Sequence, residues 1–387
     1  MQTPAVVLGA DINGLGVVRS LAREGVPTYL VDSDRADPTM RTRYPVKVIF
    51  RSLAGPGVID DLLELRRSFA HDPVLLLTQE GTVETVSAAL GRVASGYRIS
   101  MPDAVLMRRL MDKARFQALA QDLGFAIPGA AHLRSANDLA GCEALRYPCV
   151  LKPVVKTAAY QEQCLKKAYR IENAAQLCAV FREIDGAAEM IVQEWIEGSD
   201  DQIYFCLQYR SQDQRTVISF AGRKLRSWPP QTGGTASCAP APPEHREEIT
   251  RITDAFFAMV GFFGIGSMEF KRDARTGQFL MIEPTVGRTD FQEEVATLNG
   301  VNIPYAAYCC ELGRAPPPPR HVPREAAWVG GPIDRWSAEL QPQRRRDFPA
   351  GLRRYDALWR AADPLPWCAT IGKRAANRIA SLGRPGR

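Results

Sequence analysis

Several features are scarce in this sequence, and their absence narrows the range of functions. No apolar stretch approaches the roughly 20 residues that a membrane-spanning helix needs. The apolar run Ala5–Leu8 stops at once at Gly9 and is too short for a signal peptide. We therefore expect a cytoplasmic protein with no membrane insertion.

Histidine and paired cysteines are scarce as well. The chain has four histidines, and its nine cysteines show no C-x-x-C spacing. This pattern predicts reduced thiols rather than disulfides, a zinc site or a redox pair. Because no Ser/His/Asp or Cys/His arrangement is visible, the sequence favours a reaction in which the protein supplies no nucleophile.

The charge of the chain is unevenly spread. The net charge is +6 over 387 residues, and residues 331–387 alone contribute +7, from 12 Lys and Arg against 5 Asp and Glu. A basic tail can contact nucleic acid or anionic lipid. This one also contains Trp336, Trp359 and Trp367 and has no low-complexity run. We therefore expect a folded, solvated C-terminal cap and no nucleic-acid partner.

The first hundred residues alternate short apolar strands with helices. Short all-apolar strands between amphipathic helices are typical of a parallel sheet covered on both faces. We therefore predict a doubly wound α/β domain over residues 1–100. The strands are expected at residues 5–9, 27–31, 46–50 and 74–77, and the helices at 14–24 and 58–69.

Beyond this domain the pattern changes to strands that alternate apolar and polar residues, which is typical of an antiparallel sheet with one wet face. A helical stretch is expected first, at 102–128. The strands are expected at residues 148–152, 166–171, 189–195, 202–209 and 215–221, and one helix near 173–183 interrupts them. Two further strands, at 266–272 and 278–283, are expected to form a hairpin. A loop rich in Pro, Gly and Thr is expected over Ser227–Cys238, as a candidate lid. The run Pro316–Pro319 is a stiff connector. The predicted fold class is therefore α/β and α+β, divided into residues 1–100, 101–190, 191–315 and 316–387.

Two lysines stand on rigid elements. Lys152 ends the apolar strand Cys149–Pro153, and Lys113 opens a helix after Asp112, which can cap it. A single lysine at a strand end is usually a surface charge. Two lysines that flank a domain boundary could instead converge on the oxygens of a polyphosphate.

The segment Ile191–Gly198 runs from an apolar strand into acidic residues and glycine, and Ser199, Asp200 and Asp201 follow it. Such a segment is compatible with a nucleotide hinge, where backbone groups contact an adenine edge and a carboxylate holds ribose hydroxyls. The alternative is an edge strand that ends in a solvated acidic turn.

Two glutamates occupy successive strands. Glu269 lies in Ser267–Lys271 and Glu283 lies in Leu280–Pro284, so in a hairpin the two carboxylates can share a face and converge. Like charges that close repel each other unless a cation lies between them. Mg²⁺, which takes one or two carboxylates together with phosphate oxygens, suits such a site. The alternative is two glutamates that face solvent.

Taken in order, these motifs resemble those of the ATP-grasp superfamily, and most of all its carboxylate–amine ligase branch, which includes D-aspartate and D-alanine ligases. The resemblance covers about residues 1–315. It implies an ATP-grasp fold with an N-terminal doubly wound (pre-ATP-grasp) domain, and an ATP-dependent ligase that joins a small-molecule carboxylate to an amine through an acyl phosphate. The motifs that carry it are Asp112-Lys113, Val150–Pro153, Val192–Gly198, Gly222–Arg226, Met268–Lys271 and Ile282–Pro284.

The same resemblance implies cofactors and residue roles. ATP and Mg²⁺ are the expected cofactors, with Mn²⁺ as an alternative metal, and a homodimer is left open. Carried over by position, the roles are phosphate binding by Lys113 and Lys152, an adenine hinge at Gln193, Glu194, Trp195 and Ile196, ribose binding by Asp200 or Asp201, a flexible loop over the γ-phosphate with Lys224 and Arg226, metal binding by Glu269, Glu283 and Thr285, and Arg288 on the substrate carboxylate or the tetrahedral intermediate.

The sequence departs from this family at three places. Thr285 stands where the family usually has asparagine, two residues after the second metal glutamate, and its hydroxyl can still supply an oxygen ligand. Ser267 replaces an arginine of the D-alanine ligases, which disfavours that particular activity. The segment 156–159 lacks the glycines that are common after the phosphate lysine.

Two other classes of function stay open at this point. Gly9–Gly16 follows a strand and opens a helix, and Asp32 ends the next strand, as in a nicotinamide-dependent oxidoreductase, although the spacing is not G-x-G-x-x-G. The family resemblance makes this segment a helix N-terminus that could face a substrate carboxylate. The other alternative is a non-catalytic ATP-binding regulator of the same fold, which the presence of Lys224, Glu269 and Glu283 disfavours.

Overall fold

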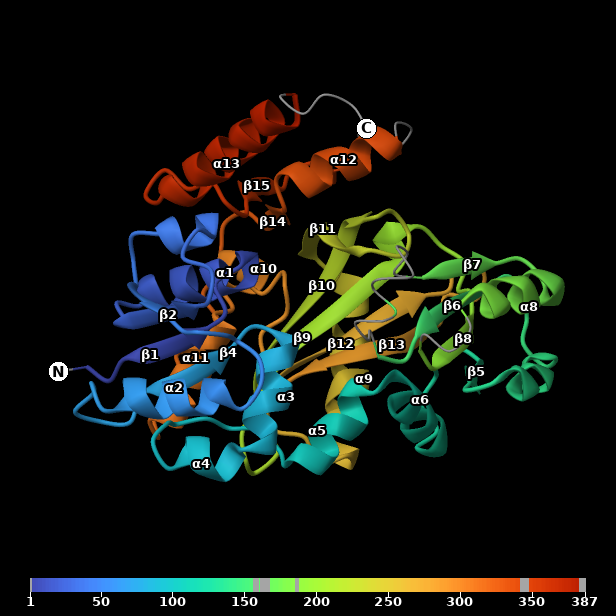
Figure 1. The fold of residues 1–387 in the computed structure, drawn as a ribbon, viewed down its shortest axis with the longest axis horizontal. Coiled ribbons are helices and arrows are strands. Elements are labelled where there is room, and N and C mark those ends of the chain that lie inside the picture. The colour runs from blue at the N-terminus through green and yellow to red at the C-terminus, as the bar shows by residue number, and fades with distance from the viewer. Residues whose placement is uncertain (1, 156–159, 161–167, 185–187, 342–347, 383–387) are drawn as a thin grey trace.

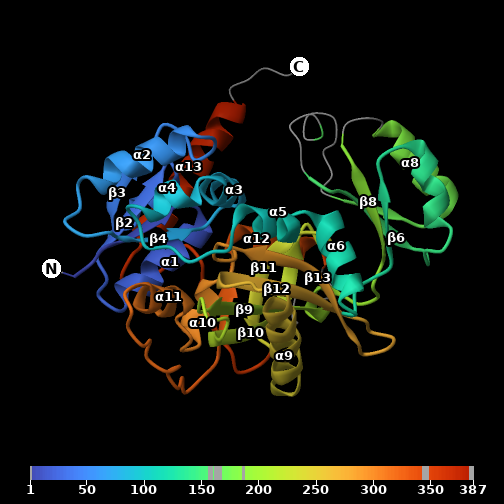
Figure 2. The ribbon, with the colours of Figure 1, turned by 90° about the horizontal axis from the view of Figure 1, so that it is seen from below.

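A computed structural model of the chain describes residues 2–155, 160, 168–184, 188–341 and 348–382. The segment 156–159, where the sequence departs from the family that it resembles, lies outside these residues. The described strands form three sheets, two of four strands and one of seven. Figures 1 and 2 show a parallel sheet at one end of the molecule, the long strands of the large sheet in the middle, and a small antiparallel sheet at the other end.

The N-terminal sheet is parallel, as predicted, and its strand order is β3-β2-β1-β4. Alternate residues of β1 pack on opposite sides: Val6 and Leu8 belong to the apolar cluster that contains α2, and Ala5 and Val7 to the cluster that contains α1. The sheet is therefore doubly wound, and the predicted fold class is confirmed. Its elements are β1 (Ala5–Leu8), α1 (Ile12–Ala22), β2 (Thr28–Asp32), η1 (Pro38–Arg41), β3 (Val46–Ile49), α2 (Gly57–Arg66), β4 (Val74–Leu77), α3 (Glu80–Ala88) and α4 (Leu90–Ala94).

Two helices, α5 (Ala104–Met111) and α6 (Lys113–Asp122), lead from this sheet to the small one. Asp112 separates them, and its side chain accepts a hydrogen bond from the backbone N–H of Arg115, so it caps α6 as predicted. The small sheet is antiparallel, in the order β5-β8-β6-β7. Its elements are β5 (Ala130–Leu133), η2 (Ala136–Cys142), β6 (Cys149–Pro153), β7 (Tyr169–Ile171), α8 (Ala174–Glu183) and β8 (Met190–Glu194).

The large sheet has the order β13-β12-β9-β10-β11-β14-β15 and is antiparallel except for its last pair. The helix α9 packs against β9, β10 and β12. The elements from residue 200 onward, which form the large sheet and the helices around it, are η3 (Asp200–Gln202), β9 (Ile203–Arg210), β10 (Thr216–Trp228), β11 (Gly234–Pro240), α9 (Pro243–Met259), β12 (Gly264–Arg272), β13 (Phe279–Val286), α10 (Glu294–Leu298), α11 (Ile303–Glu311), β14 (Ala326–Val329), α12 (Pro332–Leu340), β15 (Arg353–Asp356) and α13 (Leu365–Leu382).

The predicted loop at Ser227–Cys238 is wrong. β10 and β11 pair out to Trp228 opposite Gly234, and only residues 229–233 turn. The hairpin therefore continues through residues whose composition indicates a loop, beyond the part of β10 that pairs with β9 (up to Arg223) and the part of β11 that pairs with β14 (Ser237 and Cys238). The turn itself needs glycine at Gly233, because a Cβ there would lie 1.9 Å from the backbone of Trp228.

The C-terminal extension is folded, as expected, and two of its strands enlarge the large sheet. β14 pairs with β11, and β15 pairs with β14. Figure 1 shows α12 and α13 together at the top edge of the molecule, above the N-terminal sheet and the end of the β10–β11 hairpin. The domain boundaries at residues 100, 190 and 315 stay predictions.

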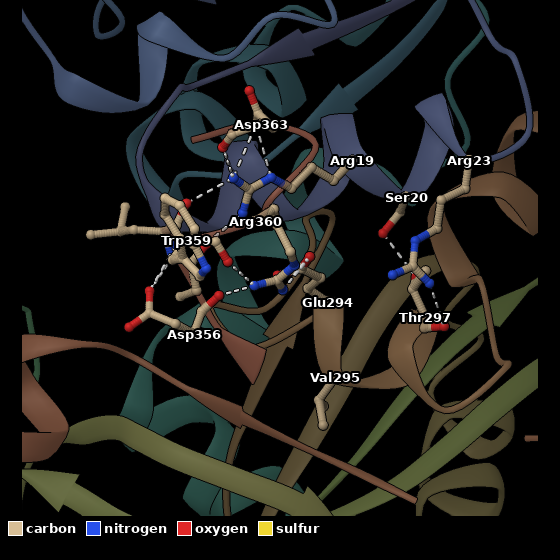
Figure 3. Close-up of polar contacts among 12 residues, drawn as sticks. Arg19, Ser20, Arg23, Glu294, Val295, Thr297, Asp356, Trp359, Arg360 and Asp363 are labelled. Atoms are coloured by element: carbon tan, nitrogen blue, oxygen red, sulfur yellow. Dashed lines mark hydrogen bonds and ion pairs between the residues drawn. The ribbon is translucent and has the colours of Figure 1, made fainter. Parts of the chain in front are cut away.

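A buried ion pair ties this extension to the N-terminal domain (Figure 3). The Arg19 guanidinium on α1 donates to the Asp363 carboxylate at 3.0 Å, and side-chain exposure is 5% for Arg19 and 0% for Asp363. Arg19 also donates to the carbonyl oxygens of Ala357 and Leu358. A second pair, Arg360 with Glu294 at 2.8 Å, lies beside it.

Candidate active site

One cavity of about 400 Å³ lies between the small and the large sheet. Its lining comes from β6 and β8 on one side, from β10, β12, β13 and the β10–β11 turn on the other, and from the α5–α6 junction. Most of the predicted site residues line it, namely Lys113, Lys152, Gln193, Glu194, Trp195, Ile196, Lys224, Glu269, Glu283, Thr285 and Arg288. Three do not, namely Asp200, Asp201 and Arg226.

The two candidate metal glutamates lie directly opposite each other. β12 and β13 form the predicted hairpin, and the register pairs Glu269 with Glu283. A register shift follows this pair, between Glu269 and Phe270. Thr285 lies two residues further along β13 and also lines the cavity. The hairpin therefore presents two carboxylates and a hydroxyl to one cavity.

Lys224 lies in the strand β10 and not in a flexible loop, which corrects the sequence-based prediction. Its ammonium nitrogen is 2.6 Å from a carboxylate oxygen of Glu269, and its side chain is buried. Burial by itself would lower the pKa of Lys224, but the carboxylates of Glu269, Glu283 and Asp290 outweigh it and raise that pKa. Lys224 is therefore a fixed cation beside the glutamate pair.

The two predicted phosphate lysines face the cavity from different elements. The Lys113 ammonium donates to the carbonyl oxygen of Val154 at 3.2 Å, and the Lys152 ammonium donates to the side-chain oxygen of Gln193, also at 3.2 Å. Gln193 in turn donates to Gln117, whose own amide donates to the carbonyl of Pro128. This chain of hydrogen bonds fixes the orientation of Lys152.

The hinge segment at the end of β8 borders the other end of the cavity. Arg146 donates to the Glu194 carboxylate at 2.7 Å, and this hydrogen bond lowers the pKa of Glu194. The guanidinium of Arg170 lies 4.8 Å from the ring centre of Trp195. Because the Glu194 carboxylate is already paired with Arg146, a planar base that bound here would contact mainly the backbone groups of this segment and the apolar side chains beside it.

Asp200 and Arg226 serve other contacts. The buried Asp200 carboxylate accepts hydrogen bonds from the backbone N–H groups of Ser227 and Gln231, so it holds the β10–β11 turn. A register shift separates Lys224 from Arg226, and after this bulge Arg226 contacts Asp334 of α12 at 3.1 Å. Asp201 accepts a hydrogen bond from Ser199.

Lys271 and Asp290 line the cavity too, although the sequence-based analysis assigned them no role. The Lys271 ammonium donates to the carbonyl oxygens of Gly198 and Ser199, and burial lowers its pKa to about 8. Asp290 accepts a hydrogen bond from Ser267 at 3.0 Å. Lys271 lies in a quoted motif, two residues after Glu269, and that spacing on a strand could have placed it on the same face.

The N-terminal glycine segment holds no open anion site. The Asp11 side chain accepts hydrogen bonds from the backbone N–H groups of Asn13 and Gly14 at the start of α1. Those donors are the ones that a diphosphate or a carboxylate would use. Asp32 accepts a hydrogen bond from the backbone N–H of Ala10. The geometry therefore disfavours a dinucleotide site.

Comparison with known proteins places this fold. No family model matches the sequence. A D-aspartate ligase of Enterococcus faecium (strain Aus0004) is 24% identical over 315 residues, which cover 77% of this chain and 74% of that protein. A formate-dependent phosphoribosylglycinamide formyltransferase of Herminiimonas arsenicoxydans is 23% identical over 274 residues. The match covers 68% of this chain and 64% of that relative, so this chain spans less than two thirds of the formyltransferase.

Solved structures share the architecture. The biotin carboxylase domain of Hydrogenobacter thermophilus 2-oxoglutarate carboxylase, in complex with MgADP, ADP and bicarbonate, has a TM-score of 0.66 at 14% identity, over 84% of this chain and 74% of that chain. The N5-carboxyaminoimidazole synthetase of Staphylococcus aureus has a TM-score of 0.66 at 13% identity, over 90% of this chain and 89% of that chain.

These likenesses define the fold as ATP-grasp, with a doubly wound domain at its N-terminus. The chain therefore has the ATP-grasp fold and is similar in sequence to a carboxylate–amine ligase of that fold, as the order of its motifs predicted.

Proposed function

We propose that this protein is an ATP-dependent ligase that forms an amide or peptide bond between a carboxylate and an amine through an acyl phosphate. One observation carries the proposal. The register of β12 and β13 pairs Glu269 with Glu283 in the same cavity that Lys113, Lys152 and Lys224 line. Three lysine ammonium groups and two carboxylates in one cavity suit a nucleoside triphosphate with a divalent cation.

The chemistry needs no protein nucleophile. A carboxylate oxygen of the acid attacks the γ-phosphorus of ATP, the bond to the bridging oxygen breaks, and ADP leaves. The amine then attacks the carbonyl carbon of the acyl phosphate, inorganic phosphate leaves, and the amine loses a proton. Such a reaction depends on positioning and on neutralising charge.

The lysines and Arg288 supply that neutralisation. Lys113 and Lys152 would bind the ATP phosphates, and the hydrogen bond from Lys152 to Gln193 supports this role because it holds the ammonium at the cavity. Lys224 would contact the γ-phosphate. Arg288 lines the cavity and donates to the carbonyl of Thr289 at 3.1 Å, which leaves other guanidinium N–H groups for the substrate carboxylate.

The carboxylate pair fits a hard divalent cation. No group of three or more His, Cys, Asp or Glu side chains suited to a metal occurs among the described residues, so an ion held by the two carboxylates would need further oxygen ligands of another kind. Mg²⁺ commonly takes one or two carboxylates and completes its shell with substrate phosphates and water. Glu269, Glu283 and Thr285 would hold Mg²⁺, with Mn²⁺ as an alternative. When bound, the ion would neutralise charge on the ATP phosphates.

The β10–β11 turn is the candidate cover for the acyl phosphate, which water would hydrolyse. Residues Gln231 to Thr235 line the cavity, and Asp200 holds the base of the turn through two backbone N–H groups. We therefore propose that Asp200 positions this turn and does not bind ribose.

The test is a screen of amino acids and hydroxy acids for release of ADP and phosphate, with each acid supplied alone and with amines. An active acid should release ADP fastest when its amine is present, and hydroxylamine in place of the amine should trap the acyl group as a hydroxamate. ATP binding without ADP release in any mixture would favour the non-catalytic regulator.

One rival function can be tested beside this screen, and two further expectations, an oligomeric state and a location, complete the proposal. Binding of NADH with the affinity of ATP would support the oxidoreductase alternative, against which the Asp11 contacts already count. One structural neighbour was solved as a biotin carboxylase domain dimer, and we propose a homodimer here as well. Sedimentation velocity of the intact protein measures this directly. A cytoplasmic location is proposed too.

A further inference from the structure

Exposed apolar side chains gather on the C-terminal helices. Among the described residues, half of the large apolar side chains that are more than a third exposed fall between residues 336 and 371. This clustering contrasts with the scattered exposed apolar residues that any protein surface carries. The six are Trp336, Leu340, Trp359, Leu365, Trp367 and Ile371.

Five of these side chains, all except Leu365, form one strip across α12, α13 and the segment before α13 that carries Trp359. Trp359 and Trp367 pack edge to face with ring centres 5.4 Å apart, and Ile371 lies one helical turn after Trp367. The next turn brings Arg374, whose guanidinium lies 5.3 Å from the ring centre of Trp336 on α12. Leu340 follows Trp336 by one turn of α12. We call these residues the aromatic strip.

Basic side chains border the aromatic strip. Lys373 and Arg374 are exposed on α13 itself. The segment 34–43 runs beside α13, because η1 packs on α13 and the backbone N–H of Arg43 donates to Asp363, and it exposes Arg35, Arg41 and Arg43. The exposed acids in these segments are Asp34, which lies 3.9 Å from Lys373, and Glu339.

We propose that the aromatic strip and its basic border dock on the surface of an anionic lipid bilayer. Tryptophan suits the boundary between headgroups and acyl chains, isoleucine and leucine add buried apolar area, and lysine and arginine attract anionic headgroups. The contact is peripheral, since no described helix is long and apolar enough to cross a membrane. It does not depend on the proposed ligase activity.

The chemistry of the strip disfavours two other occupants. A second copy packed on it by two-fold symmetry would bring the same basic border against itself. A nucleic acid would use the arginines, but its phosphates gain nothing from exposed Leu340, Leu365 and Ile371. A bilayer uses both kinds of side chain together.

Vesicle flotation of the intact protein tests the proposal. The protein should float with vesicles of phosphatidylcholine mixed with phosphatidylglycerol and stay unbound with phosphatidylcholine alone, and added salt should weaken the binding. Trp367→Ser with Ile371→Ser should lower the partition coefficient at least tenfold. The matched control is Val105→Ser with Met259→Ser, two exposed apolar residues of α5 and α9, which should leave it unchanged.

A charge variant keeps the test independent of aromatic packing. Arg35→Gln, at an exposed border arginine, should weaken binding about fivefold, the effect of removing one cation near an anionic surface. Arg67→Gln, an exposed arginine that follows α2, is its control and should have no effect. Three outcomes would overturn the proposal. The protein could fail to float with anionic vesicles, or the strip and control variants could lose binding equally. In the third outcome, vesicle binding is absent and the strip variants instead abolish self-association or binding to duplex DNA.

Discussion

Removal of the Asp363 carboxylate should loosen the C-terminal extension from the N-terminal domain. Asp363 accepts hydrogen bonds from Arg19, from the Thr42 hydroxyl and from the backbone N–H of Arg43. Asp363→Ala removes the acceptor of all of these donors and leaves the buried Arg19 cation without its hydrogen-bonded counter-ion, with Glu294 as the remaining carboxylate that acts on it. Removing one partner of a buried ion pair costs about 3–5 kcal/mol.

Thermal unfolding measures this effect. For a cooperative unit of this chain's length, a loss of about 3–5 kcal/mol corresponds to a melting temperature lower by roughly 4–6 °C. Asp60→Ala is the control, because Asp60 forms an ion pair with Arg92 in which both side chains are more than half exposed. Exposed pairs contribute about 0–1 kcal/mol, so that variant should melt close to the parent.

The double variant Arg19→Met with Asp363→Ala sharpens the test. It removes both charges, so its loss should be smaller than the sum of the two single losses by about 0.5–3 kcal/mol. If Asp363→Ala melted no lower than Asp60→Ala, or if the two single effects were additive, the ion pair would not be what holds the extension in place.

Three further predictions concern the cavity and the buried glutamate beside it. Lys152→Ala and Lys113→Ala should each weaken ATP binding about ten- to hundredfold without unfolding the protein. If calorimetry measured an unchanged ATP affinity in both variants, the two lysines would not bind the phosphates. Glu283→Gln should abolish ADP release and, without Mg²⁺, melt near or above the parent because one of two like charges is gone; near-parental turnover would refute the metal role. Burial raises the pKa of Glu293 to about 8 from its ordinary 4.5, so the folded state keeps a proton that the unfolded state loses. Stability is therefore lost as pH rises from 4.5 to 8, by up to about 1.4 kcal/mol per pH unit. Glu293→Gln should be neutral near pH 4.5 and stabilising at pH 8, and an equal effect at both would contradict this.

Local patterns in the sequence were enough to predict the parallel sheet, the Asp112 cap and the β12–β13 hairpin. In each case the signal is short-range: an all-apolar strand, an acidic residue before a helix, or two strands joined by a tight turn. The pairing of Glu269 with Glu283 followed from that hairpin alone. Eleven of the fourteen predicted site residues line one cavity. The roles of Lys224, Thr285 and Arg288 came from the resemblance to the ATP-grasp superfamily and not from a local pattern.

The features that sequence reasoning missed depend on distant parts of the chain. β15 has the sequence Arg-Arg-Tyr-Asp, which carries no apolar alternation, and it becomes a strand because β14 offers it an edge. The bulge after Lys224 that turns Arg226 toward α12 leaves no mark in composition. Lys271 acts on the backbone carbonyls of Gly198 and Ser199, and no side-chain motif encodes such a contact.

The glycine segment at Gly9–Gly16 follows a strand and opens a helix, as predicted, but its hydrogen bonds disfavour the dinucleotide that such a motif suggests. Glycine at Gly14 is required, since a Cβ there would lie 2.0 Å from the carbonyl oxygen of Gly9. The same bend carries Asn13 to the carbonyl oxygens of Thr78 and Thr289. Arg288 donates to that same Thr289 carbonyl. The segment therefore contacts the backbone beside Arg288, and Asp11 accepts the hydrogen bonds of the N–H groups at the helix N-terminus. Under the proposed function, this contact would fix the position of the Arg288 cation for a substrate carboxylate.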